Sequence, residues 1–409
     1  MAEDRRPQVG LAGWLTAGWS ALTTLLIALA VPAVQASPLL PQAVSLLHAD
    51  IAARDASGQP PEGCPALPEA LSDWAYEDLL ASAPSRGVLL RMTHPDHHGL
   101  AAPTEPMTSP DASTDAGSEP DVELAGDPVE AEAPLRESYL YALPPIALQA
   151  WLVPGPEVRT AMAAVDRVVF ELDLGDAAVF ESMDALARRA LASADNGRPG
   201  VPRLPPDLAQ RLQQALAAAC LEPPADWRPE IRALALLTGL MRREGHEPAY
   251  SIAGSLADLA VTMGKPMSGM ETPERQLAPL LGDSPEAVAE RVRLTLDAAA
   301  RPETLAALAR MQDGWDSAVL SDLRLFERRC NCRQTPFEQA LWRDIEARNT
   351  ALADQIAAMH QRGGTVFVAL GALQMTGGGG VIALLEAQGF QFQWMSYPRR
   401  PPQPSGPGR

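Results

Sequence analysis

Residues 364–395 constrain the fold of this chain most, because they form an ordered series of short elements. Residues 366–370 are apolar and β-branched, as in a buried strand, and residues 381–388 repeat apolar side chains at helical spacing. Between them, Gly371 and the glycines at 377–380 permit backbone conformations that other residues resist. A loop that ends at a helix N-terminus in this way is where a fold presents a ligand or a catalytic group to a cleft.

The charge of the chain is strongly acidic and unevenly distributed. The 409 residues carry a net charge of -18 and are 46% hydrophobic, which is typical of a soluble globular protein and argues against a nucleic-acid partner. Residues 101–134 are rich in Pro, Ser, Thr, Ala, Gly and acidic side chains and contain no Lys or Arg. Few large apolar residues interrupt this stretch, so we predict a disordered acidic insert.

The N-terminus has the features of an export signal. Arg5 and Arg6 precede an uncharged apolar run at residues 11–34, and small residues at Val34 and Ala36 flank Gln35 ahead of a cleavage position. We therefore predict a signal peptide over residues 1–36 and a periplasmic or secreted protein. The alternative is an uncleaved segment that anchors the chain in the membrane, facing the periplasm, because the apolar run is long enough to span a bilayer.

Export would place the cysteines in a compartment where disulfides form. The chain has four of them, Cys64, Cys220, Cys330 and Cys332, so three pairings into two disulfides are possible. A metal or redox role for the Cys330-Asn331-Cys332 pair is less favoured, because the sequence has no second close pair and no histidine nearby.

The hydrophobic pattern predicts a few strands and many helices. Strands are expected at residues 87–92, 138–142 and 166–173, the first two forming a hairpin whose turn is enlarged by the acidic insert. Amphipathic helices are expected over six segments: 178–194, 207–220, 229–243, 285–300, 303–323 and 336–361. An irregular stretch is expected at 265–272, and a disordered proline-rich tail at 396–409.

Several short motifs, taken in their order along the chain, indicate a protein family. They are Tyr139-Leu140-Tyr141, the strand of residues 168–173, Gly264-Lys265-Pro266, Gly269-Met270-Glu271-Thr272, Gln276-Leu277, Arg348-Asn349 and the C-terminal segment. This order resembles the TraB/GumN family, which is related to the Tiki metalloproteases and the erythromycin-esterase-like hydrolases. The resemblance implies one α+β domain over residues 37–395, with a small mixed β-sheet built from two pseudo-repeated halves and flanked by many α-helices.

The resemblance also implies a metal-dependent hydrolytic site, formed by two Gly-x-x-His motifs and a strand-borne Glu. Here Ala142 and Pro145 occupy the Gly and His positions of the first motif, and Gln374 replaces the histidine of the second. Ala253 stands where the family commonly has an Asp. Each change removes a metal ligand or an acid–base group, so we expect no cofactor, the alternative being a divalent metal such as Mn.

The remaining polar residues define a candidate cleft. They are Glu171, Glu271, Arg348 and Asn349, beside Gly371, Gln374 and Pro145. In one interpretation Arg348 holds a carboxylate of Glu171 or of a ligand in a bidentate pair. In the other, the same charges form a structural ion pair that joins the helices to the sheet, since buried charges must be paired in any case.

Two further motifs carry less weight. His94, His97 and His98 suggest metal ligands, but the hairpin places them far from position 145, and a solvated loop is the favoured interpretation. The glycines at 377–380 lack the pattern of a nucleotide-binding loop.

These features together predict an exported TraB/GumN-like pseudoenzyme. Its role would be to bind or scaffold an envelope protein or peptide, with membrane contact only if the N-terminal segment is uncleaved. The alternative functions are an active Tiki-like metal-dependent hydrolase or peptidase and a purely structural protein tethered to the membrane.

Overall fold

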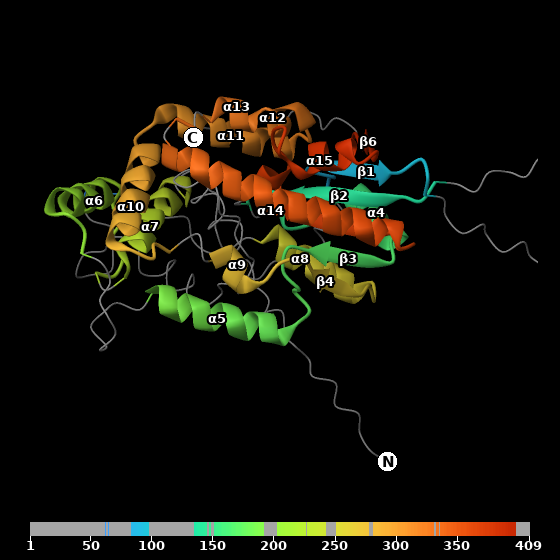
Figure 1. Ribbon diagram of the computed structural model, residues 1–409, viewed down its shortest axis with the longest axis horizontal. Helices are drawn as coiled ribbons and strands as arrows, with labels where there is room; N and C mark the ends of the chain where they lie inside the picture. The colour runs from blue at the N-terminus through green and yellow to red at the C-terminus, as the bar shows by residue number, and fades with distance from the viewer. Residues whose placement is uncertain are drawn as a thin grey trace, which may run out of the picture.

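The computed structural model describes most of the chain between residues 83 and 397 (Figure 1). The described residues are 62, 64, 83–97, 135–144, 147–148, 151–191, 203–225, 227–242, 251–277, 281–330, 333–334 and 336–397. The predicted signal peptide and acidic insert, Pro145, His98, Cys332 and most of the predicted tail lie outside these residues. Within them, no helix is both long and apolar enough to cross a membrane.

A six-stranded mixed sheet lies at the centre, in the order β4-β3-β5-β2-β1-β6. The strands are β1 Leu89–Thr93, β2 Ser138–Leu143, β3 Arg167–Phe170, β4 Met267–Gly269, β5 Val366–Gly371 and β6 Gln391–Trp394. The first four in spatial order are parallel to their neighbours, whereas β1 pairs antiparallel with both β2 and β6. The first five residues of β2 and of β5 are buried, as expected for central strands covered on both faces.

The predicted hairpin is confirmed. β1 and β2 pair with Leu89 opposite Tyr141 and Met92 opposite Ser138, so the loop that connects them contains the acidic insert. The loop therefore leaves the sheet at the end of β1 and returns at Leu135, just before β2.

Helices surround the sheet, and the predicted α+β class with a small mixed sheet and many helices is confirmed. In Figure 1, α14 runs along the sheet, while α6, α7 and α10, which contact one another, gather at one end of the molecule. The helices are α4 Pro156–Ala164, α5 Ala177–Leu191, α6 Pro206–Ala218, α7 Pro229–Arg242, α8 Ile252–Thr262, α9 Pro273–Leu277, α10 Pro285–Ala299, α11 Pro302–Asp316, α12 Leu320–Arg324, α13 Phe326–Arg329, α14 Pro336–Gln361 and α15 Val381–Ala387. The internal pseudo-repeat stays a prediction.

The single helix predicted at residues 303–323 is wrong, because the chain forms α11 and α12 instead. Ala318 adopts a left-handed conformation with φ 54°. The amide of Val319 donates to the carbonyl of Gly314, and that of Ala318 to the carbonyl of Trp315, which is the pairing of a Schellman helix end. No glycine marks this end, so the sequence does not reveal it.

The irregular stretch predicted at 265–272 contains the short strand β4, which pairs in parallel with β3. A Cβ at Gly269 would lie 2.3 Å from the backbone nitrogen of Asp173. Glycine therefore allows the end of β4 to approach the chain that leaves β3, and this approach brings Glu271 beside Glu171.

Two of the cysteines are joined directly. Cys64 and Cys220 form a disulfide across a sequence separation of 156 residues. Cys330 is also disulfide-bonded. At the other end of the described chain, Tyr397 packs against the core, so the ordered body extends past β6.

Candidate functional site

The parallel strands bring the predicted site residues to one edge of the sheet. Glu171 directly follows β3, Gly371 ends β5, and Glu271 follows β4 by two residues. Leu143, the last residue of β2, pairs with Gly371. The carboxyl ends of parallel strands are where open α/β sheets bind ligands, so this edge is the natural place for a site.

Both carboxylate oxygens of Glu171 accept hydrogen bonds from the protein. The side chain is almost fully buried, with 5% of the residue exposed. The backbone N–H of Gly371 donates to Oε1 over 2.7 Å, and the Gln276 amide donates from Nε2 to Oε2 over 3.0 Å. Because β3 ends at Phe170, the Glu171 side chain turns away from the ladder toward these donors.

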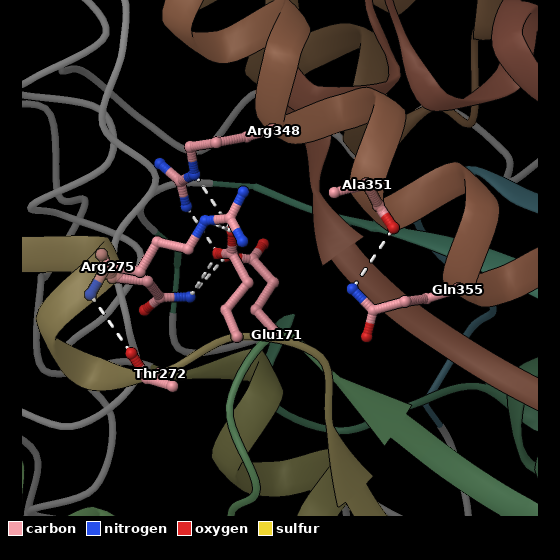
Figure 2. A network of polar contacts seen from close by, with 8 residues as sticks. Glu171, Thr272, Arg275, Arg348, Ala351 and Gln355 are labelled. Carbon is pink, nitrogen blue, oxygen red and sulfur yellow. Dashed lines mark hydrogen bonds and ion pairs between the residues drawn. The ribbon is translucent and has the colours of Figure 1, made fainter.

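Glu271 forms the bidentate pair that the sequence suggested for Arg348. The guanidinium donates from Nε to Oε1 over 3.0 Å and from Nη2 to Oε2 over 2.5 Å. Gln276 Nε2 lies 3.2 Å from Oε2, so one amide bridges the two glutamates. Arg275 adds a longer ion pair of 3.8 Å from a half-exposed side chain. Figure 2 shows Glu171 and Arg348 in this network, which we call the carboxylate cluster and define as Glu171, Glu271, Gln276 and Arg348.

Two helices position the donors of the carboxylate cluster. Pro273 starts α9, whose first turn is capped by a bond from the Arg275 amide to the Thr272 hydroxyl, and this short helix directs Gln276 inward. The long helix α14 supplies Arg348 and, beside it, Asn349, whose amide donates to the Gly379 carbonyl over 3.0 Å. The glycine-rich loop is therefore tied to the same helix.

The carboxyl group of Glu171 holds its proton unusually strongly. Burial and, after it, the charge of the neighbouring Glu271 raise its pKa to about 8, against the opposing effects of the Gly371 amide and Arg348. At neutral pH the group is therefore mostly protonated. Gln276 Oε1 has no hydrogen-bond partner among the described residues, and rotating that amide by half a turn would offer this oxygen to the Glu171 proton.

Gln374 lies close to this cluster and is completely buried. It belongs to the 3₁₀ helix Ala372–Met375, which directly follows β5. Three residues of 3₁₀ helix rise by roughly 6 Å, so Gln374 is near Gly371 and hence near Glu171. Neither its Oε1 nor its Nε2 has a partner among the described residues, and the same holds for Oδ1 of the buried Asn349.

The strands that lead into the two motif positions are neighbours in the sheet, as expected if the two motifs form one site. Ala142 pairs with Leu370 across β2 and β5, so the chain segments that carry the two motifs leave the sheet side by side. Pro145 lies outside the described residues. Ala253 is buried at the start of α8, where Ser251 caps the helix through a 2.9 Å bond from the Gly254 amide.

The side chains present do not fit a divalent metal. Arg348 engages both oxygens of Glu271, and protein donors engage both oxygens of Glu171, so a cation would compete with a fixed guanidinium charge. Among the described residues, no group of three or more His, Cys, Asp or Glu side chains is placed to hold a metal ion.

A surface pocket of about 330 Å³ lies away from the carboxylate cluster. Its lining includes Asp166, Arg167, Arg362 and Thr365, at the amino ends of β3 and β5. It is therefore separated from the carboxylate cluster by the length of these strands.

The interpretation of the histidines as a solvated loop is wrong for His94 and His97. Their rings stack with centroids 4.2 Å apart, and His97 lies 5.3 Å from the ring of His360. His360 is completely buried and was missed, because nothing in the sequence of α14 indicates that its last turn meets the β1–β2 loop. Gln276 was missed as a bridging amide for a similar reason. We call His94, His97 and His360 the imidazole cluster.

Comparison with protein families matches residues 132–393 to the TraB/PrgY/gumN family. The matched stretch is well over half of the chain and runs from just before β2 into β6, so it includes the whole carboxylate cluster and Gln374. Neither the comparison with curated proteins nor that with solved structures found a match. The family match and the order of the motifs agree, and the chain belongs to the TraB/PrgY/gumN family.

Proposed function

We propose that this protein is an exported binding protein of the cell envelope, in which the hydrolytic site of the family has become a polar binding site. Its partner would be a peptide segment, either free or part of an envelope protein. The observation that carries this proposal is that all four oxygens of Glu171 and Glu271 accept bonds from protein donors.

Hydrolysis would need chemistry that these residues do not favour. A general base must be able to take a proton near neutral pH, whereas Glu171 already carries one under those conditions. The amide of Gln374 is neither a base nor a strong ligand for a transition metal. The bidentate Arg348–Glu271 pair supports the structural interpretation of these charges.

Binding of a neutral polar group suits the same residues. Among the described residues, Gln374 has unused donors and an unused acceptor, and Asn349 Oδ1 is an unused acceptor. A peptide group offers one donor and one acceptor, so it complements a buried amide of this kind. Leaving such groups unpaired costs about 1–3 kcal/mol each, which a ligand would recover on binding.

The proposal is tested on the purified mature chain by metal analysis, by titration with Mn²⁺, Co²⁺ and Zn²⁺, and by peptidase assays. We expect no stoichiometric metal, no saturable metal binding and no cleavage. Stoichiometric metal that is lost in Glu171→Ala, together with peptidase activity, would instead support the metal-dependent hydrolase.

Binding itself is tested with a peptide library and the matched variants Gln374→Met and Gln388→Met. Gln374→Met keeps the side-chain length but removes the unused amide, so bound peptides should lose affinity. Gln388→Met changes an exposed glutamine after α15 and should leave affinity unchanged. Equal affinity in both variants would contradict a role for Gln374.

The envelope location is tested by N-terminal sequencing of the native protein. Cleavage before Ser37 is the expected result. A chain that begins near Met1 and is extracted only by detergent would favour the membrane anchor.

A further inference from the structure

The imidazole cluster joins segments that are far apart in the sequence. His94 and His97 follow β1, His360 is in the last turn of α14, and Phe390 precedes β6. The Phe390 ring lies 5.0 Å from the ring of His94 and 5.4 Å from that of His360. The cluster therefore packs the open end of the β1–β2 hairpin against the C-terminal part of the fold.

Hydrogen bonds fix the same junction. His360 Nδ1 lies 2.9 Å from the Ser138 hydroxyl, which also accepts from the Val366 amide over 3.1 Å. The Arg136 guanidinium donates to the His360 carbonyl, and the Arg136 amide donates to the His97 carbonyl over 3.0 Å. The starts of β2 and β5 are thus tied to the end of α14.

The described residues offer little compensation for added positive charge here. His97 Nδ1 and His360 Nε2 are buried and have no hydrogen-bond partner among the described residues. The guanidinium of Arg136 is already present, and the nearest described carboxylate, Asp96, lies 3.9 Å from His94 with a side chain that is 84% exposed.

Within the part of the chain that the structure describes, the carboxylates of the other elements at the junction have partners elsewhere, and Asp354 on α14 accepts a hydrogen bond from the Gln388 side chain over 3.0 Å. The turn before β6 contributes the Gln388 carbonyl, 3.3 Å from His94 Nε2. Glu137, beside Arg136, is paired with Arg91 at 2.7 Å, and Glu386 on α15 is paired with Arg324 at 2.9 Å. Protonated imidazoles would therefore face one another and Arg136.

We propose that the imidazole cluster is an acid-sensitive latch, which holds the open end of the hairpin on α14 and the α15–β6 turn while the His97 and His360 rings are uncharged and releases it when these two rings bind protons. Burial, followed by Arg136 and the other rings, lowers the pKa of His360 to about 4, and burial followed by His94 also lowers the pKa of His97. The buried rings of His97 and His360 therefore bind protons less readily in the closed state than in the open state.

Hydrogen–deuterium exchange of the full mature chain between pH 7.5 and pH 5 tests the latch. Protection factors, corrected for the intrinsic pH dependence of exchange, should fall about thirtyfold in β1, the start of β2 and β6, because His360 with an open-state pKa near 6.5 favours opening tenfold per unit below that value. Protection in α7 and α10, which lie in a separate part of the fold, should stay constant.

Two variants separate charge from packing. His360→Asn keeps a polar side chain that can hydrogen-bond Ser138 but cannot titrate, so it should lose most of the pH dependence. Arg136→Met removes a charge that opposes protonation, so the histidine resonances of His360 should titrate at higher pH by NMR, whereas a merely structural role would loosen the hairpin equally at every pH.

Three results would overturn the latch. The first is a pKa of His360 near or above 6.5 in the native protein. The second is constant protection of the hairpin down to pH 5. The third is simultaneous loss of protection in α7 and α10, which would indicate global acid unfolding.

Discussion

The carboxylate cluster lies at the carboxyl ends of the parallel strands and the imidazole cluster at their amino ends. The buried polar groups of the two clusters are stabilised in different ways. At the carboxyl edge, donors from β5, α9 and α14 meet every oxygen of two glutamates. At the amino edge, three imidazoles rely on ring packing, and two of their buried nitrogens have no partner in the part of the chain that the structure describes. The charges of Glu271 and Arg348 are thus paired with each other, whereas burial favours the neutral forms of Glu171, His97 and His360.

The two clusters also respond to pH in opposite directions. The pKa of Glu171 is raised in the folded state, so its contribution to stability is present at low pH and is lost as pH rises from about 4.5 through about 8. The pKa of His360 is lowered, so its contribution is present above about 6.5 and is lost as pH falls toward about 4. Near neutral pH, Glu171 is protonated and His360 is not.

The largest expected effect comes from breaking the ion pair. Glu271→Ala should lower the free energy of unfolding by about 3–5 kcal/mol, because it removes the bidentate partner of the buried Arg348. Chemical denaturation at pH 7 measures the change. The double variant Glu271→Leu/Arg348→Met removes both charges and should recover much of the loss, and a loss as large as that of the single variant would show that charge pairing is not the cause.

A smaller effect is expected at the imidazole cluster when the pH is lowered. The free energy of unfolding should fall by about 2 kcal/mol between pH 6.5 and pH 5 through His360, since each pKa unit corresponds to about 1.4 kcal/mol. His360→Asn should remove this part of the slope. If the variant and the natural chain show the same slope, the buried imidazole is not the titrating group.

In the carboxylate cluster, Glu171→Gln should change stability at high pH and leave it nearly unchanged at low pH. At pH 4, where the carboxyl group is protonated in both the folded and the unfolded state, the natural side chain resembles the amide, so stability should be nearly unchanged. Between pH 6 and pH 9 the stability difference should widen by about 2–3 kcal/mol in favour of the variant, because the variant carries no buried group that must ionise. Destabilisation by Glu171→Gln at both pH 4 and pH 9 would contradict the protonated carboxyl.

Gln374→Met tests a buried amide whose nitrogen and oxygen both have no partner among the described residues. Removing an unpaired polar group of similar shape should leave stability unchanged or raise it by about 1 kcal/mol. Thermal unfolding, with Gln388→Met as control, measures the difference. A loss above about 2 kcal/mol would mean that the amide is hydrogen-bonded in solution and is no longer available to a ligand.

The smallest effect is expected from the acidic insert, which connects β1 to β2 beside the imidazole cluster. Deleting residues 102–132 should change the free energy of unfolding by less than about 1 kcal/mol, because loop-closure entropy depends only on the logarithm of loop length. A large change would show that the insert packs on the body of the protein.

Local pattern predicted much of this fold. Both strands of the hairpin, β3, β5, and helices such as α6, α7 and α14 lie where apolar periodicity placed them. Their positions follow from short-range preferences: β-branched runs for strands, helical spacing for helices and proline at first turns. The bidentate Arg348 pair was also anticipated, although its partner is Glu271.

The sequence by itself determined the family and most of the elements, because both depend on the pattern of neighbouring residues along the chain. Tertiary structure alone decided that β4 joins the sheet, that Gln276 bridges two glutamates, and that His360 meets His97. These contacts join residues separated by as many as 263 positions, and their energies depend on burial and on neighbouring charges. Neither quantity exists until the chain has folded.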